Sequence, residues 1–274
     1  MAFSSPVFSI ITICKNSAHD LWETAQSILS QEGFAPTEFI IIDGASTDNT
    51  AEIIGNIRHA FQEKGFPLLI ISEPDHGIYD AMNKGTRYAH GEWINFMNAG
   101  DRFAGNTVLK EIYQYIAASE KPADVFYGSV RQVLAFGEIT IQPRNLSYLD
   151  RKMAFCHQCT FLRKEVQEEH PYDLSFRIAA DYEFFHWCYR SGKVFMKMPV
   201  TVAIFESEQG LSSRNRLLMN REYARANGRS KTISWKLEYT AKVLEVGFNK
   251  LWRSLFPQAI VNRIRQHHYS STSL

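Results

Sequence analysis

Residues 7–14 read VFSIITIC, a nearly unbroken run of β-branched and other apolar side chains. Such a run is typical of a strand buried on both faces of a parallel sheet, because an exposed face favours alternating polar residues. Three shorter runs follow along the chain: FIIID at 39–43, LLIIS at 68–72 and WINFM at 93–97. Helical patterns lie between them. This alternation predicts right-handed βαβ units and a mostly parallel, Rossmann-like sheet flanked by helices.

Polar residues follow these strands, at the edge where open parallel sheets bind their ligands. Asp43 begins the sequence DGASTDNT, where its carboxylate can accept hydrogen bonds from a nucleotide base or ribose. The same carboxylate can instead stabilise the turn before the next helix. The polar end of the first strand, Thr12 to Asn16, is expected beside Asp43, which favours a ligand contact.

The segment EPDHGIYDAMNKG, residues 73–85, is unusually polar for a connection that follows a buried strand. Its glycines permit tight turns and close approach of the backbone. The side chains expected to shape a donor pocket, or to hold one another, are Asp75, Asp80, Asn83 and Lys84.

The fourth strand runs into Asn98-Ala99-Gly100-Asp101, which is either a plain turn or a metal site. One carboxylate beside small residues suits Mg²⁺ or Mn²⁺, since these ions prefer oxygen ligands and keep waters or phosphate oxygens in their shell. Asp101 is therefore a candidate metal ligand.

The second half of the chain has weaker periodicity. A helix is predicted near 107–117, strands from 124 to about 144, a helix over 180–189 and a strand over 199–205. Beyond Gly210 the pattern becomes helical and basic as far as Arg265, with interruptions at Gly228 and Pro257. Between Arg229 and Arg265 there are eight Lys or Arg and only two Glu.

Bulk composition excludes several classes of protein. Apolar residues make up 45% of the 274 residues and charged residues 22%, which is ordinary for a globular protein. A formal net charge of +1 argues against a general nucleic-acid binder. No apolar run approaches the length needed to span a bilayer, and four scattered cysteines indicate free thiols. We expect a cytoplasmic protein.

Seven motifs, in order, resemble family 2 glycosyltransferases of the GT-A fold: IITICKN, IIDGASTDNT, EPDHGIYDAMNKG, GEWINFMNAGD, HQCTF, ADYEF and GLS. The resemblance covers residues 7 to about 212 and is closest to bacterial enzymes that build exopolysaccharide, O-antigen or capsule. It implies a GT-A domain over residues 1–228. The nucleotide-binding half would be about 1–101 and the acceptor half about 102–212, followed by a basic amphipathic helical extension over 229–274.

The resemblance also implies roles for single residues. Thr12, Asn16 and Asp43 would hold the nucleotide, and Asp101 would bind Mn²⁺ or Mg²⁺. Asp181 would be the catalytic base of an inverting transfer. His157 and Gln158 match a pair that usually faces the active centre, in contact with donor or acceptor.

This chain departs from the family pattern at two positions. Gly100 precedes Asp101 where many relatives have a second acidic residue, which places the metal requirement in question. Met82 stands where many relatives have an Arg, so phosphate contacts would come from Lys84, Arg214 or Arg216.

The expected reaction moves a sugar from a nucleotide sugar, most often a UDP-sugar in this family, to a lipid-linked saccharide. A nucleotidyltransferase is the first alternative, but it would ordinarily carry a glycine-rich, arginine-containing loop where this chain has CKNSAHD. A processive synthase is a second alternative, but it would need membrane spans and a QxxRW motif, and this sequence shows neither. A non-catalytic sugar-nucleotide binding module is disfavoured by the intact Asp43, Asp101 and Asp181.

The basic extension is hypothesised to bind the inner face of the plasma membrane peripherally. Leu244, Phe248, Leu251, Trp252 and Leu255 recur at helical spacing, beside Lys242, Lys250, Arg253, Arg263 and Arg265. Such a helix can lie in the interface of an anionic membrane. The alternatives are that the stripe packs on the catalytic domain or forms a dimer contact.

Overall fold

The computed structural model describes residues 7–33, 36–134, 137–206 and 215–255. The strands are β1 (Phe8–Cys14), β2 (Thr37–Asp43), β3 (Leu68–Ser72), β4 (Trp93–Phe96), β5 (Arg102–Phe103), β6 (Val125–Leu134), β7 (Gly137–Ile141), β8 (Thr160–Arg163) and β9 (Phe195–Glu206). The helices are α1 (Ala18–Leu29), α2 (Thr50–Glu63), α3 (Ile78–Tyr88), α4 (Val108–Ala117), α5 (Lys164–Glu169), α6 (Ala180–Arg190), α8 (Arg216–Ala226) and α9 (Ile233–Leu255). Short 3₁₀ turns occupy η1 (Leu146–Asp150), η2 (His157–Cys159) and η3 (Arg229–Lys231).

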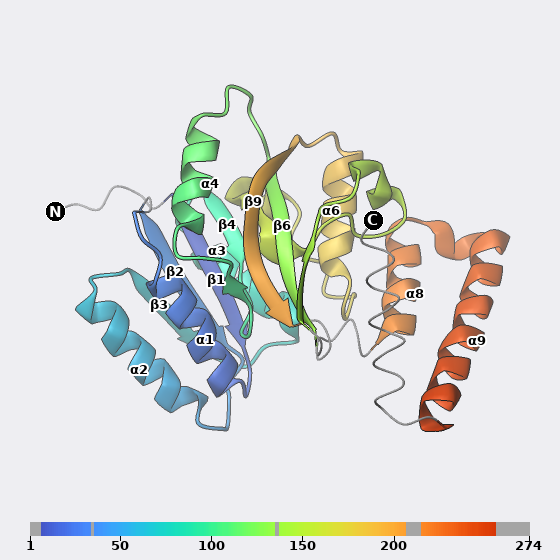
Figure 1. The fold of residues 1–274 in the computed structure, drawn as a ribbon, viewed down its shortest axis with the longest axis horizontal. Coiled ribbons are helices and arrows are strands. Elements are labelled where there is room, and N and C mark those ends of the chain that lie inside the picture. Colours follow the sequence, from blue (N-terminus) through green and yellow to red (C-terminus); the bar gives the residue numbers. More distant parts are fainter. Residues whose placement is uncertain (1–6, 34–35, 135–136, 207–214, 256–274) are drawn as a thin grey trace.

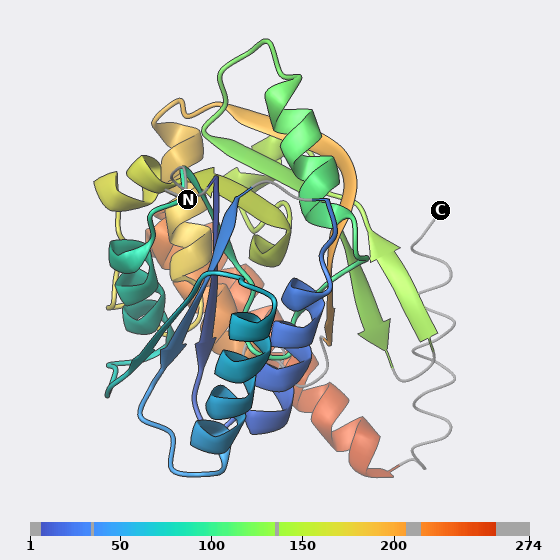
Figure 2. The same cartoon turned by 90° about the vertical axis from the view of Figure 1, so that its left-hand side faces the viewer.

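One sheet runs through the molecule in the order β3-β2-β1-β4-β8-β6-β9-β5, with β7 paired to β6. The first four strands are parallel, as the sequence predicts. In the second half, β8 is antiparallel to both β4 and β6, while β6 and β9 are parallel. Helices α1 and α2 cover one face of the first half and α3 covers the other (Figures 1 and 2).

Most of the element boundaries agree with the sequence pattern. Helices α4 and α6 match the predictions over 107–117 and 180–189. Helix α3 begins at Ile78 rather than Asp80, and β9 begins at Phe195 rather than Pro199. Strands β5 and β8 were not predicted, since two and four residues are too short to show a period.

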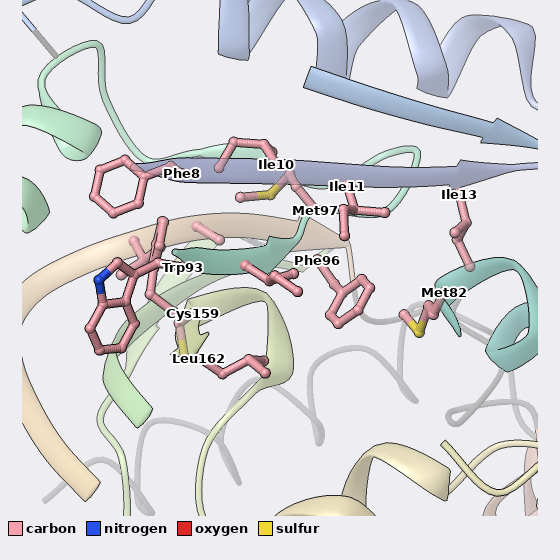
Figure 3. Close-up of a cluster of buried hydrophobic side chains, with 14 of the residues drawn as sticks. Phe8, Ile10, Ile11, Ile13, Met82, Trp93, Phe96, Met97, Cys159 and Leu162 are labelled. Carbon is pink, nitrogen blue, oxygen red and sulfur yellow. The ribbon is translucent and has the colours of Figure 1, made fainter. Parts of the chain in front are cut away.

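Strand β1 forms the centre of the core (Figure 3). All seven of its residues are buried, which confirms the two-sided burial that VFSIITIC predicts. Phe8, Ile10 and Ile11 have no exposed surface. Helix α3 packs directly on this strand at Gly85, where a Cβ atom would collide with Ile11 Cγ2. The close approach fixes α3, and with it the polar segment 73–85, against the end of the sheet.

Helices α8 and α9 lie at one side of the molecule, where α8 packs next to α6 and α9 lies on the far side of α8 (Figure 1). The chain turns between these two helices near Gly228, whose φ of 73° is a left-handed conformation that favours glycine. Leu244 and Phe248 on α9 are 69% and 67% exposed, so these two side chains do not pack on the rest of the described chain. The side chains of 249–255 and the residues 256–274 lie outside the described part, and with them the rest of the predicted stripe.

None of the helices within the described ranges is both long and apolar enough to cross a bilayer. All four cysteines lie within those ranges and carry free thiols, as predicted.

Candidate active site

Asp43 lies at the carboxyl end of β2, opposite Cys14 of β1 and Ser72 of β3. Its side chain is buried, and its carboxylate accepts hydrogen bonds from Ser72 Oγ (2.5 Å), Ser46 N (3.2 Å) and Ser46 Oγ. Asp43 therefore stabilises its own turn, as one of the two sequence-based interpretations predicts. Asp43 also lies at the carboxyl ends of the parallel strands, where a nucleotide contact is expected.

Asn16 joins the loops that follow β1 and β2. Its backbone has a φ of 51°, a left-handed conformation that Asn tolerates better than most residues. Its Oδ1 accepts a hydrogen bond from Thr47 N at 2.8 Å, and its own N–H donates to Ser46 Oγ at 2.8 Å. Thr12 is different, because it is fully buried and its hydroxyl donates to Met97 O at 2.6 Å. The buried Thr12 side chain ties β1 to Met97, the residue that follows β4, and does not reach the protein surface.

Three carboxylates surround the end of β1. Burial raises the pKa of the Cys14 thiol to about 12, and the charges of Asp43, Asp48 and Asp75 add to the effect. Asp75 packs so closely on Gly44 that a Cβ atom there would collide with Asp75 Oδ2. The structure thus brings Asp43 and Asp75 to one edge of the sheet.

The 73–85 segment is held largely by its own side chains. Lys84 Nζ donates to Pro74 O at 2.6 Å and lies 3.0 Å from Glu73 Oε1 and 3.6 Å from Asp80 Oδ2. Desolvation lowers the pKa of Lys84, but the hydrogen bond to Glu73 and the neighbouring carboxylates raise it by more, so Lys84 stays charged.

Asn83 points away from this segment, towards the residues before α6. Its Nδ2 donates to Tyr172 O at 2.9 Å and its Oδ1 accepts from Tyr172 N at 3.0 Å. The amide is buried and engaged on both sides. Its observed role is therefore to clamp the Tyr172 backbone.

Asp101 ends the turn that follows β4. Thr24 Oγ1 holds this turn by donating to Asp101 O at 2.8 Å and accepting from Gly100 N at 3.0 Å. The φ of Gly100 is 96°, a left-handed conformation that favours glycine over residues with a Cβ atom. Burial raises the pKa of the Asp101 carboxyl to about 6, against the His157 charge and hydrogen bonds from Gln158 and the Asn98 backbone.

His157 lies between this turn and α6. Its Nδ1 is 3.4 Å from Asp181 Oδ2, and its Nε2 is 3.1 Å from Asn98 Nδ2. With its proton on Nδ1, the ring donates to Asp181 and accepts from Asn98. Burial lowers the pKa of His157, but the hydrogen bond to Asp181 and the charges of Asp181 and Asp101 raise it by more.

Asp181 lies in the first turn of α6 with its side chain 19% exposed. Oδ1 accepts from Tyr79 OH at 3.1 Å and from Tyr182 N at 2.8 Å, while Oδ2 faces His157. Burial, together with the Asp181 charge, raises the pKa of Tyr79 well above its ordinary value, so the phenol remains a donor. Tyr79 was missed in the sequence, although the motif that contains it was recognised.

The residues around Asp101 fit a divalent cation held by few protein ligands. Within the described ranges, no group of three or more His, Cys, Asp or Glu side chains is placed to hold a metal. Asn98 Oδ1 is buried and lacks a hydrogen-bond partner among the described residues, so it offers an uncharged oxygen in the same turn. Mg²⁺ and Mn²⁺ take a diphosphate and waters as the remainder of their shell.

The structure therefore forms two clusters from the predicted residues. Asn16, Asp43 and Asp75 lie at the ends of β1 to β3, and Asp101, His157, Gln158 and Asp181 lie between β4 and α6. Of the predicted phosphate contacts, Arg216 begins α8 and Arg214 lies outside the described ranges.

Comparison with known proteins gives consistent results. Residues 9–170, more than half of the chain, match the sequence profile of the family described as Glycosyl transferase family 2. A protein of Mycobacterium bovis named "PGL/p-HBAD biosynthesis glycosyltransferase" is 31% identical over 220 residues, which are 77% of this chain and 80% of that protein.

Two solved structures share the fold at low sequence identity. The S. aureus TarS 1-349 complex with UDP-GlcNAc has a TM-score of 0.60 and 17% identity, over 80% of this chain and 66% of that one. The mannosyltransferase PcManGT from Pyrobaculum calidifontis, in complex with GDP-Man and Mn²⁺, has a TM-score of 0.60 and 14% identity. It matches 98% of this chain and 81% of its own.

Proposed function

The chain belongs to glycosyl transferase family 2 and has a GT-A fold, and we propose that it transfers a sugar with inversion at the anomeric carbon. The observation that carries the proposal is the arrangement around His157. One imidazole contacts Asp181, the candidate base, on one side and Asn98, in the turn that carries the candidate metal ligand Asp101, on the other. An inverting displacement needs these two functions on opposite sides of the reacting carbon.

Asp181 is the proposed general base. The acceptor hydroxyl gives its proton to Asp181 Oδ2 as its oxygen attacks the anomeric carbon, and the bond from that carbon to the diphosphate breaks. The nucleoside diphosphate leaves with the bonding electrons. Oδ1 accepts from both Tyr79 OH and the Tyr182 N–H, whereas Oδ2 has only the longer contact with His157 Nδ1 (3.4 Å), so Oδ2 retains a lone pair for the incoming proton.

The proposed donor is a UDP-sugar, with Mn²⁺ or Mg²⁺ as cofactor. Asp43, Asn16 and Asp75 would bind the nucleoside, and Asp101 with Asn98 would hold the metal. When bound, the metal would neutralise charge on the departing diphosphate. The charged Lys84 lies beside the same strand ends and supplies a second, protein-borne cation.

The proposed acceptor is a lipid-linked saccharide used for a bacterial surface polysaccharide. Helix α9 supports this through its surface: Ile233, Leu237, Leu244 and Phe248 lie on one face and are 67–76% exposed. The basic excess of residues 229–265 complements anionic lipid. We propose that this helix docks on the inner face of the plasma membrane.

Flotation with anionic liposomes tests the docking. The full-length variant Leu244→Glu/Phe248→Glu should lose lipid binding at low salt, while Ile141→Glu, an apolar site on β7, should retain it. If the double variant floats as well as Ile141→Glu, the α9 surface is not the membrane-binding surface. Failure of the wild type to float, with dimers that the double variant loses, would assign this surface to a second copy of the chain.

A panel of sugar nucleotides tests the reaction. UDP-GlcNAc, UDP-glucose, UDP-galactose and GDP-mannose are offered with octyl glycosides as amphiphilic acceptors, with and without Mn²⁺. We expect nucleotide release that depends on acceptor and metal, and a product of opposite anomeric configuration by NMR. Nucleotide binding without transfer or hydrolysis would favour a binding module, and retained configuration would exclude the direct displacement.

A further inference from the structure

Helix α8 contains a buried carboxylate that the proposed chemistry does not use. Glu222 is 6% exposed. Its Oε1 accepts a hydrogen bond from Arg177 N at 2.9 Å, and its Oε2 accepts from Ile178 N at 3.0 Å. Both donors belong to the segment directly before α6, whose first turn holds Asp181.

Further contacts from the same part of the chain reach both sides of Asp181. Ahead of it, the Arg225 guanidinium lies 3.9 Å above the ring of Phe176. After it, the ring of Tyr223 lies 4.3 Å from that of Tyr182, whose hydroxyl accepts from Asn227 Nδ2 at 2.9 Å. Side chains of α8, together with Asn227, therefore contact the chain both before and after Asp181.

Among these contacts, we expect the two hydrogen bonds to the Glu222 carboxylate to be the strongest. A carboxylate that accepts two backbone N–H groups forms charge-assisted hydrogen bonds, which are stronger than neutral ones. Removing one acceptor oxygen of Glu222 leaves the backbone N–H of Arg177 or Ile178 without its hydrogen-bond partner. A buried donor without a partner is unfavourable. The segment is then free to shift, and α6 begins two residues later.

We infer that Glu222 is a positioning residue for Asp181 and that α8 acts through it to fix the base relative to the acceptor hydroxyl. The inference rests on the proposed role of Asp181 as base. It assigns to α8 a part in the chemical step, although α8 lies beyond residues 9–170 that match the family profile. A displacement of about 1 Å at a reacting group can reduce turnover by about 10²-fold.

The test uses full-length protein and four forms: wild type, Glu222→Gln, Asp181→Asn and Glu238→Gln. Glu238 is the matched control, since it lies on α9 with a side chain 61% exposed and pairs with Arg229. UDP affinity with Mn²⁺, donor KM and kcat for release of UDP are measured on each preparation. The kcat is expressed per molecule able to bind UDP, which removes any unfolded fraction.

Glu222→Gln should lower kcat at least tenfold while UDP affinity and donor KM stay within twofold of wild type, and Glu238→Gln should match wild type. A kcat within twofold of that control would overturn the positioning role, as would a parallel loss of UDP affinity. Activity retained by Asp181→Asn would instead remove the base assignment, and the inference with it.

If Glu222→Gln yields no protein that binds UDP, Glu222→Asp takes its place. The shorter side chain must draw α8 and the 177–178 segment together to keep both bonds. We expect at least a threefold loss of kcat at unchanged UDP affinity, and a wild-type kcat would overturn the inference.

Discussion

Acidification should weaken metal binding by protonating Asp101. Burial raises the pKa of its carboxyl from 3.8 to about 6, despite the opposing His157 charge. Because a carboxylate ligand must be deprotonated, protons compete with the metal. With a pKa of about 6, the deprotonated fraction falls from about nine-tenths at pH 7 to about one-tenth at pH 5, so the Kd for Mn²⁺ should rise about tenfold.

The assay is a calorimetric titration of Mn²⁺ into the UDP-bound protein at pH 5, 6 and 7. Since phosphate groups of UDP also take up protons in this range, the comparison with Asp101→Asn isolates the contribution of the carboxyl. The variant should bind Mn²⁺ more weakly and with less dependence on pH. If the Kd for Mn²⁺ depends on pH in the same way in both proteins, the assignment of the metal to Asp101 is refuted.

The same pKa predicts the stability of the metal-free protein. A carboxyl whose pKa is higher in the folded state stabilises the fold below its unfolded pKa, and this contribution is lost as the pH rises through the folded pKa. For Asp101 the window runs from 3.8 to about 6. The loss is at most about 3 kcal/mol, from roughly two pK units. Urea unfolding with chelator should show this loss relative to Asp101→Asn.

Three further predictions concern the base and the core. Tyr79→Phe removes a donor to Asp181 and should lower kcat about tenfold at unchanged UDP affinity, as measured by UDP release. Because the hydrogen bond to Asp181 and the charges of Asp181 and Asp101 raise the pKa of His157 against burial, the unfolding free energy should fall as pH rises above 6.5, and His157→Gln should flatten that slope in urea titrations. Gly91→Ala places a Cβ 2.6 Å from a β1 backbone nitrogen and should cost about 1–3 kcal/mol in thermal unfolding, unlike Gly105→Ala, which meets open space.

The sequence predicts the first half of the fold well, because the physical signals there are local. A strand buried on both faces must be apolar along its length, and VFSIITIC is. Parallel pairing then brings the strand ends to one edge, so the proximity of Asp43 and Asp75 follows from topology alone. Strand β8, by contrast, depends on antiparallel partners far away in sequence.

The second cluster follows from the sequence only through family resemblance. Asp101 and Asp181 are 80 residues apart in the chain, and no periodicity indicates that His157 lies between them. The donor-binding role expected for Asn83 was drawn from its polarity, whereas both sides of its amide hold the Tyr172 backbone. A Glu in a polar, basic helix carries no signal of burial, so the contacts of Glu222 appear only in three dimensions.

Turnover by Asp181→Asn tests the central claim most directly. The variant preserves the shape of the side chain and removes the proposed proton acceptor, while Asp43 and Asp101, the proposed nucleotide and metal contacts, are unchanged. We predict that kcat for UDP release to an octyl glycoside falls by about 10²- to 10⁴-fold, with the UDP Kd within twofold of wild type. A variant that keeps more than a tenth of wild-type kcat would contradict the account.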